Sequence, residues 1–249
     1  SGPMRPGTDT IAAPPFPARL PWVNVAALRM DKQIGRPVLI EFWDFCRVNS
    51  LRTLPYVRAW HERYAEAGLR VIGVHTPGFP CSRDEAEVRA ACARLDVEHP
   101  VVIDADAQIW GLYENAGWPA RYLWDQRGML HDYHYGEGAY DETERAIQEL
   151  LGVSGDLVAP VRPEDVPGAV LAVPTPDVAG PYSGPYEAGA VWAVLDGAGT
   201  ASANGDEIRV DGPGVRRLVE HPRHTAAVLD FATGPGVTCH ATCFVAGLA

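Results

Sequence analysis

The stretch from Val38 to Pro55 constrains the fold of this chain most, because it joins a buried strand to a helix through a cysteine. It reads V-L-I-E-F-W-D-F-C-R-V-N-S-L-R-T-L-P. The near-continuous apolar run 38–42 is typical of a strand buried on both faces of a sheet. Apolar positions at helical spacing follow over 47–67. The pattern predicts a strand, a tight connection containing Cys46, and a helix.

Strands and helices continue to alternate after this unit, which predicts an α/β domain. The helix nearest the middle of the domain begins with S-R-D-E, a capping pattern that places its N-cap at Ser82. We expect strands over 70–75 and 101–104, helices over 84–95, 107–115 and 142–151, and a hairpin-like pair over 122–125 and 130–135 around Gly128.

Three further motifs accompany the stretch 38–55. They are L-R-V-I-G-V-H-T-P (69–77), W-P-A-R-Y-L-W-D-Q-R-G (118–128) and G-E-G-A-Y-D-E-T (136–143). Together the four segments resemble the TlpA-like thioredoxin family, most of all the soluble module of DipZ-type proteins. The resemblance covers roughly residues 15–152 and implies a thioredoxin-like fold. A weaker similarity continues into the C-terminal region, where that module carries a β-sandwich resembling carbohydrate-binding modules.

The chain departs from the family at the redox motif. When Trp43 and Pro55 are matched to W-x-x-x-C-x-x-C-x-x-x-x-P, the two cysteine positions fall on Arg47 and Ser50. Cys46 lies one residue before the first of them. In a dithiol, the second thiolate resolves the mixed disulfide that the first one forms. Ordinary C-x-x-C exchange is therefore not expected.

Cys46 and Cys81 are the candidate catalytic residues. Cys46 is expected at or just before a helix N-terminus beside Arg47, and both features favour a thiolate and hence the most reactive of the thiols. The alternative is an inert, packed thiol. Cys81 follows the neighbouring strand, so the two cysteines could face each other at one sheet edge. It is either a resolving cysteine or an ordinary loop residue.

The resemblance implies that Pro119, after Trp118, is the family's cis-proline, which lies against the redox motif. Two arginines and a histidine at a helix N-terminus suggest anion affinity. The alternative is that Arg47 and Arg52 pair with Asp44 or Glu41. The residues expected to line the cleft are Trp43, Asp44, Arg47, Asn49, Ser50, Arg52, His75, Trp118 and Pro119.

The C-terminal region has a different character. Residues 154–189 are rich in proline and glycine and predict a linker or wrapping segment. Asn204-Gly205 is a strong type I′ hairpin signal. The expected division is an extended lead over 1–20, a thioredoxin-like domain over 21–153, the linker, and an all-β, jelly-roll-like sandwich over 190–249. Its strands are expected over 191–195, 200–203, 207–210, 215–220, 226–231 and 237–245.

The remaining cysteines and the histidines of the C-terminal region are expected to have structural roles and no catalytic or metal-binding role. Cys92 lies on the apolar face of a helix, and Cys239 and Cys243 are expected on one face of the last strand as core residues. His221, His224 and His240 are expected to be structural or loop residues, because the spacing of a cupin-type metal site is missing. We therefore expect no metal and no cofactor.

Composition limits the partners and the location. The chain has 249 residues, a net charge of -11 and a pI near 5.1, which argues against a nucleic-acid binder. Ser1-Gly2-Pro3 resembles a cleavage scar, so Met4 is the expected native start. No leader or membrane span is evident, and the five cysteines are scattered. A cytoplasmic location is expected, or an exported one if a leader was removed.

Two functions remain open from the sequence. One is a single-cysteine thiol redox or peroxide-reactive protein that acts through Cys46, with Cys81 or an external thiol resolving its sulfenic acid. The other is a redox-inactive thioredoxin-fold binding protein that uses the same cleft. The expected ligands are a small thiol, a peroxide or a peptide, and the sequence does not indicate an oligomeric state.

Overall fold

The chain divides into two compact units, which are described separately. The computed structural model describes residues 10–249, so the predicted scar and the start at Met4 lie outside it. The first unit comprises the residues up to Phe45 together with 49–78 and 83–159. The second comprises 46–48, 79–82 and 160–249, so the short segments that carry Cys46 and Cys81 belong to it.

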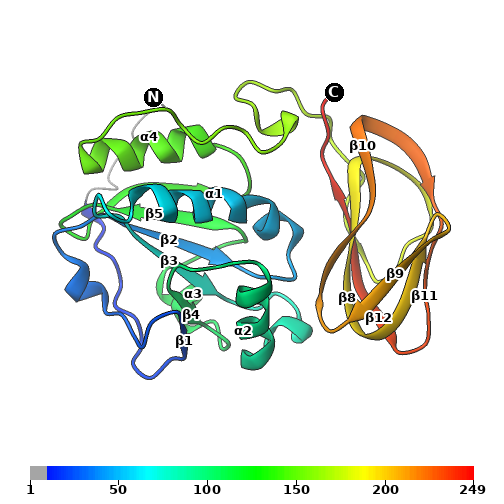
Figure 1. Cartoon of the computed structure of the whole chain (residues 1–249), viewed down its shortest axis with the longest axis horizontal. Helices are drawn as coiled ribbons and strands as arrows, with labels where there is room; N and C mark the ends of the chain where they lie inside the picture. The colour runs from blue at the N-terminus through cyan, green and yellow to red at the C-terminus, as the bar shows by residue number, and fades with distance from the viewer. Residues whose placement is uncertain (1–9) are drawn as a thin grey trace. The chain divides into compact units, whose positions relative to one another are not determined.

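One six-stranded sheet organises the first unit, in the order β1-β4-β3-β2-β5-β6 (Figure 1). Strands β2 (Val38–Trp43), β3 (Arg70–His75) and β4 (Val101–Ile103) are parallel. The antiparallel strands are β1 (Trp22–Val23), β5 (Ala120–Trp124) and β6 (Leu130–Tyr135). Parallel β2 and β3 joined by a helix, followed by the β5–β6 hairpin, form the predicted thioredoxin-like fold.

Among residues 10–159, three α-helices connect these strands and a fourth follows β6. They are α1 (Val48–Tyr64), α2 (Glu85–Arg94), α3 (Gln108–Leu112) and α4 (Tyr140–Leu151). The predicted cap of α2 at Ser82 is wrong, because the Asp84 carboxylate accepts from the N–H groups of Ala86 and Glu87. Ser82 instead belongs to the short 3-10 helix η3 (Pro80–Ser82), where its hydroxyl donates to the Phe79 carbonyl.

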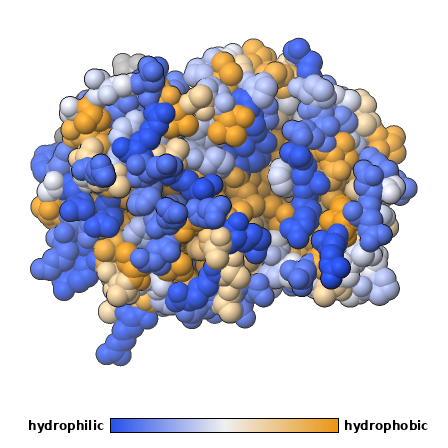
Figure 2. Space-filling model, in the orientation of Figure 1, coloured by the Kyte–Doolittle hydropathy of each residue, from blue (hydrophilic) through white to orange (hydrophobic). Residues whose placement is uncertain are grey.

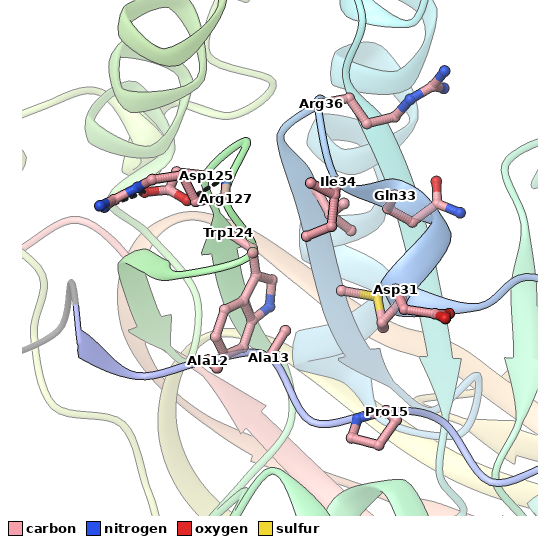
Figure 3. A pocket seen from close by; sticks show the side chains of 13 residues that line it. Ala12, Ala13, Pro15, Asp31, Gln33, Ile34, Arg36, Trp124, Asp125 and Arg127 are labelled. Atoms are coloured by element: carbon pink, nitrogen blue, oxygen red, sulfur yellow. Dashed lines mark hydrogen bonds and ion pairs between the residues drawn. The ribbon is translucent and has the colours of Figure 1, made fainter.

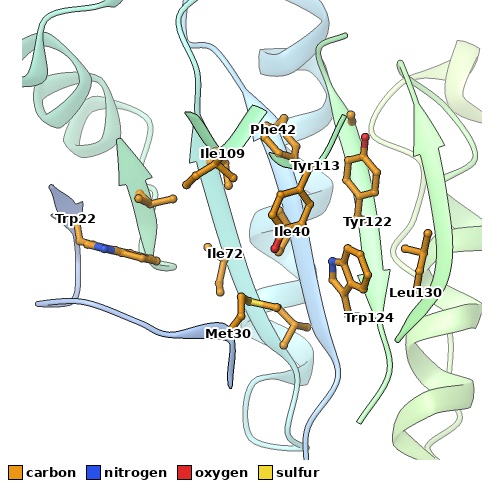
Figure 4. Packing of buried hydrophobic residues seen from close by; sticks show 14 residues of the cluster. Trp22, Met30, Ile40, Phe42, Ile72, Ile109, Tyr113, Tyr122, Trp124 and Leu130 are labelled. Atoms are coloured by element: carbon orange, nitrogen blue, oxygen red, sulfur yellow. The ribbon is translucent and has the colours of Figure 1, made fainter. Parts of the chain in front are cut away.

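Successive residues of β2 pack on opposite faces of the sheet, so the strand is buried on both sides. Leu39 packs with residues of α1 and α4 such as Trp60 and Ile147. Ile40 and Phe42 pack on the other face with Ile109 of α3 (Figure 4). This two-sided burial explains the continuous apolar run in the sequence, which a strand covered on one face does not require.

The second unit is all-β. The remaining strands are β7 (Val178–Ala179), β8 (Gly184–Ala203), β9 (Asp206–Asp211), β10 (Gly214–Leu229), β11 (Phe231–Thr233) and β12 (Val237–Val245). β8 is a single strand of 20 residues that pairs with β10 and β12 in its first part and with β9 and β11 in its last part. A core that includes Tyr186, Leu195, Val210 and Phe244 fills the sandwich.

Two predicted breaks between strands in this unit are wrong, because one longer strand continues through each of them. Residues 196–199 were expected to separate the strands 191–195 and 200–203, but β8 runs through Gly197 and Gly199 and exchanges partners there. A Cβ on Gly197 would lie 2.0 Å from the Gly236 carbonyl oxygen, so these glycines permit close strand approach. β10 likewise continues over the two predicted strands 215–220 and 226–231, with a register shift between Glu220 and Thr225.

The Asn204-Gly205 turn has positive φ at both residues, as type I′ requires.

Part of the predicted linker 154–189 belongs to the second unit. β7 pairs with β12, and Ala172 donates its N–H to the Gly247 carbonyl. The first residues of β8 also lie before residue 190. The segment between Val161 and Val173 exposes several apolar side chains. On the face shown in Figure 2, hydrophobic and hydrophilic residues are interspersed. Within residues 10–249, no helix has the length and apolar character needed to cross a membrane.

Candidate functional site

The carboxyl ends of β2 and β3 lie side by side, since Trp43 pairs with His75 in register. The connection after β2 carries Cys46, two residues before α1 begins, and the connection after β3 carries Cys81 on η3. The Cys46 Sγ and Cys81 Sγ atoms are 3.8 Å apart. The Cys46 side chain is fully buried, at 0% exposure, whereas Cys81 is partly exposed.

Asp44 organises the connection between β2 and α1. Its carboxylate accepts from the Gly78 N–H at 2.7 Å, and its own N–H donates to Ser50 Oγ at 3.2 Å. Ser50, which the sequence resemblance matched to the second cysteine of C-x-x-C, is fully buried in this contact. The site where a resolving thiol would stand therefore holds the turn together.

His75 is fully buried beside this turn. Its Nε2 atom accepts from the Phe45 N–H at 3.2 Å, and its ring stacks on Phe45. The same Nε2 atom lies 3.6 Å from the Asp44 Oδ1 atom. Trp43, expected to line the cleft, is 1% exposed, and its ring meets that of His75 edge-on. Both side chains therefore support the turn from the core.

The predicted cationic residues have separate partners. Arg52 is buried and forms an ion pair with Glu137 at 2.7 Å, a partner that the sequence did not indicate. The Arg47 guanidinium lies over the Phe79 ring at 4.9 Å. Asn49 is exposed on the first turn of α1. Glu137 is thus a partner of Arg52 beyond Asp44 and Glu41, which the sequence suggested.

A polar network that the sequence did not reveal holds the loop before β5. The Trp118–Pro119 peptide bond is cis. Trp118 Nε1–H donates to the Thr76 carbonyl at 2.8 Å, and the indole packs against Trp110. Asp104 accepts from the Thr76 hydroxyl and from two N–H groups at the start of α3. This buried aspartate therefore ties the ends of β3 and β4 to α3.

Glu41 on β2 and Arg121 on β5 are buried directly opposite each other in register. Both are 1% exposed. Burial raises the pKa of Glu41 to about 8, and the nearby Arg121 charge opposes that rise. Arg121 donates to the Gly138 carbonyl and the Thr143 hydroxyl and lies over the Trp60 ring. The sequence marked neither residue as a member of a buried pair.

The prediction that Cys239 and Cys243 share one face is wrong. Cys239 pairs with Leu195, but Ala241 pairs with the adjacent Val194, so β12 contains a bulge at His240. The alternation of faces is displaced there, and Cys239 packs in the core whereas Cys243 pairs with Trp192 on the other face. Burial raises the pKa values of Cys92 and Cys243 to about 12.

The histidines of the second unit differ in their surroundings. His221 Nε2 lies 2.8 Å from the Tyr186 hydroxyl, and His224 approaches Glu187 at 3.7 Å. These two have the structural surroundings expected. The ligand atoms of Cys81, Asp196 and His240 all lie within 4.8 Å of one another, a grouping suited to a metal ion.

A pocket of about 250 Å³ lies at the opposite end of β2 from the cysteines (Figure 3). Val38, the first residue of β2, lines it with Trp124, and the Asp125–Arg127 ion pair lies at its edge. Residues 12–15 form another part of its wall. No predicted site residue lines it.

The fold and the cysteine-bearing edge define a thioredoxin-fold protein, and comparisons with known proteins agree. The chain is 35% identical over 133 residues to protein DipZ of Mycobacterium tuberculosis, a match over 52% of this chain and 19% of DipZ. It is 27% identical over 131 residues to the thiol-disulfide oxidoreductase YkuV of Bacillus subtilis, covering 52% of this chain and 87% of YkuV. No family model matches.

A solved structure shows the same fold. The thioredoxin-like superfamily protein SPOA0173 superposes with a TM-score of 0.52 at 21% identity, over 58% of this chain and 99% of its own. The first unit is thus a thioredoxin-fold module similar to those of DipZ-type proteins. The chain spans about a fifth of the length of DipZ.

Proposed function

We propose that this protein is a thiol redox protein whose redox couple is Cys46 and Cys81. The observation that carries the proposal is the 3.8 Å separation of their Sγ atoms. A disulfide bond is about 2.05 Å long, so closing it requires a movement of less than 2 Å, within reach of side-chain rotation and a small loop shift. The pair replaces the absent C-x-x-C with two cysteines on adjacent loops.

Exposure assigns the roles of the two thiols. Cys81 is partly exposed and would meet the oxidant, whereas Cys46 is fully buried and would act second. This order reverses the roles expected from the sequence, in which Cys46 was the attacking thiol. The limited exposure favours a small disulfide over a disulfide within a folded protein as the substrate.

The reaction is a two-step exchange. The Cys81 thiolate attacks one sulfur of the small disulfide, whose S–S bond breaks to release the first thiol. Cys46 then attacks Cys81 Sγ, the mixed disulfide breaks, and the second thiol leaves. The protein loses two electrons and two protons, which the small disulfide gains, and the Cys46–Cys81 bond forms.

The similarity to YkuV supports a redox function in general, because that relative is a thiol-disulfide oxidoreductase. Ser50 supports a mechanism different from C-x-x-C exchange. Its buried hydroxyl accepts a hydrogen bond from the Asp44 N–H, and it cannot supply a thiol. The partner thiol of Cys46 is therefore supplied from the loop after β3 and not from the first turn of α1.

Peptide mapping after oxidation tests the proposal. The reduced full chain is treated with oxidised glutathione, digested without reductant and analysed by mass spectrometry. We expect a linked pair of peptides that contain Cys46 and Cys81, and a mixed disulfide at Cys81 in the Cys46→Ser variant. The Cys92→Ser variant is the matched control and should form the same link as the natural chain.

Two results would overturn the proposal. One is an oxidised protein in which Cys46 and Cys81 remain unlinked while the chain is folded. The other is equal formation of the link in unfolded protein, which would show that the fold does not select this pair. Either result would leave the redox-inactive binding protein as the better account of the chain.

A further inference from the structure

We propose that Cys81, Asp196 and His240 form a binding site for a divalent transition metal ion, with zinc as the ion that best fits the ligands. The three side chains come from η3, β8 and β12, all within the second unit. Their ligand atoms lie within 4.8 Å of one another. The proposal does not depend on the redox reaction, although it shares Cys81 with it.

The ligand chemistry selects the class of metal. A thiolate, an imidazole and a carboxylate are all common zinc ligands, and thiolate and imidazole disfavour calcium and magnesium. Zinc bonds of about 2.0–2.3 Å in a tetrahedron place neighbouring ligand atoms about 3.3–3.8 Å apart. The observed cluster therefore needs only small side-chain rotations to close around an ion, which leaves a fourth position for water or a further ligand.

His240 provides independent support. Its Nε2 atom is buried and has no hydrogen-bond partner in the structure. A buried polar atom without a partner costs about 1–3 kcal/mol, so such atoms call for an explanation, and an ion is one. His221 offers a contrast in the same unit, since its Nε2 atom is bonded to the Tyr186 hydroxyl.

The strand geometry directs His240 and Asp196 to the same place. His240 is the extra residue of the β12 bulge, a feature that often re-aims a side chain. Asp196 pairs with Thr238 and alternates with Leu195, which packs in the core, so its carboxylate leaves the opposite face of β8. The ring of Phe79, two residues before Cys81, lies 6.2 Å from the His240 ring.

Charge in the surroundings is mixed. Arg47 lies over Phe79, and its positive charge opposes the binding of a cation. A thiolate and a carboxylate together supply two negative charges, which neutralise a divalent ion and leave the arginine charge to be offset by other groups. Asp177, which lies close to Cys243, adds a further negative charge on this side of the unit.

Metal titration of the reduced full chain, free of any histidine tag, tests the site. Zinc affinity is measured by competition with a chromophoric chelator, and Co²⁺ serves as the spectroscopic probe. We expect one ion per chain, a thiolate-to-cobalt charge-transfer band and the intense visible bands of a four-coordinate site. The variants Cys81→Ser, His240→Gln and Asp196→Asn should each weaken zinc binding at least about a hundredfold, since losing an outer-shell partner alone costs 10- to 100-fold.

Matched variants separate the site from adventitious binding. Cys243→Ser and His224→Gln change the same residue types in the same unit and should bind zinc as the natural chain does. Circular dichroism establishes that each variant is folded, and Asp196→Asn preserves the side-chain shape. An absent thiolate band, or unchanged affinity in folded Cys81→Ser and His240→Gln, would overturn the metal site. Neither result bears on the Cys46–Cys81 link, which is measured in metal-free protein.

Discussion

At the scale of single residues, the exposure of a thiol in the folded chain determines its reactivity more than its position in the sequence does. Cys46 was expected to be the most reactive, because it precedes a helix and neighbours Arg47. The structure buries it completely, and Cys81 is the partly exposed member of the pair. A thiolate must be reached by its reagent as well as formed, so accessibility decides the order of reaction.

Alkylation at pH 7 should therefore modify Cys81 first and Cys46 later. Cys92 and Cys239 are buried, and burial raises their pKa values, that of Cys92 to about 12, so both should stay unmodified until the protein unfolds. Cys243 is partly exposed, but burial raises its pKa to about 12, so it should react more slowly than Cys81. Timed treatment with iodoacetamide followed by peptide mapping measures this order. Modification of Cys46 as fast as Cys81 would contradict it, and unfolded protein, in which all five should react, is the control.

Glu41 should make stability depend on pH. Its pKa is raised from 4.5 to about 8 in the folded state by burial. Between these values the carboxyl stays protonated in the folded chain but ionises on unfolding, so unfolding releases a proton and stability falls as pH rises. The stabilisation is complete below pH 4.5 and is lost as pH passes through about 8.

The Glu41→Gln variant removes this contribution while preserving shape. Relative to the variant, the natural chain should lose a few kcal/mol of unfolding free energy between these pH values, since one pKa unit corresponds to about 1.4 kcal/mol. Urea unfolding at a series of pH values measures the difference. Parallel curves for the two proteins would show that Arg121 holds the carboxylate ionised in the folded state.

At the scale of elements, strands buried on both faces could be predicted, whereas long-range adjustments could not. The apolar run of β2 and the Asn204-Gly205 turn are local signals, and both predictions are confirmed. The continuation of β8 through Gly197 depends on close approach by Gly236, a contact that no local pattern reveals. The β12 bulge likewise depends on its pairing with β8, so the position of His240 could not be predicted.

In the candidate site too, some features follow from the order of the elements and others depend on long-range packing. Parallel neighbouring strands bring Cys46 and Cys81 to one sheet edge, which the order of elements already predicts. The partners of Arg52 and Asp104 include residues distant in sequence, namely Glu137 and Thr76. Such partners depend on tertiary packing, so a single sequence indicates the charged residue but not what it binds.

Asp104 should contribute more to the free energy of unfolding than an ordinary helix cap does. Its buried carboxylate accepts from Thr76 and from Ile109 and Trp110 at the start of α3. The Asp104→Ala variant leaves three donors without a partner, and we expect a loss of about 3 kcal/mol. The matched control is Asp84→Ala, an exposed cap of α2, with an expected loss of about 1 kcal/mol. Chemical denaturation measures both, and equal losses would contradict the role assigned to Asp104.

At the scale of the whole molecule, residues 160–169 should be the most accessible connection in the chain. The first unit ends at Ala159, and from Val170 onward the backbone bonds to the C-terminal strand region. Val161 is exposed there and precedes Arg162, so its bond can be cleaved, whereas Pro167 blocks cleavage after Val166. Limited digestion with elastase, which cleaves after small apolar residues, should give two fragments that separate within this segment. Trypsin is a poor probe because Arg162 precedes Pro163, and first cleavage inside β8 or α1 would contradict the prediction.

Oxidation and metal binding should exclude each other, because both use the Cys81 sulfur. This prediction rests on the redox couple and the metal site together. A thiolate that coordinates zinc loses its ligand character when it enters a disulfide, so closing the Cys46–Cys81 bond removes one of three ligands. By linkage, the metal must then disfavour oxidation by the same free energy with which oxidation disfavours the metal.

The expected result is the release of one zinc ion for each disulfide formed when the zinc-loaded chain meets oxidised glutathione. A chromophoric zinc indicator follows release, while quenched samples report the Cys46–Cys81 link by mass spectrometry. Saturating zinc should slow the appearance of that link. In Cys46→Ser, release should instead accompany a mixed disulfide at Cys81, whereas Cys243→Ser should match the natural chain. Oxidised protein that carries the link yet keeps its zinc with unchanged affinity would show that Cys81 is not a ligand. Zinc-independent oxidation of a chain that does bind zinc would place the ion away from the redox couple.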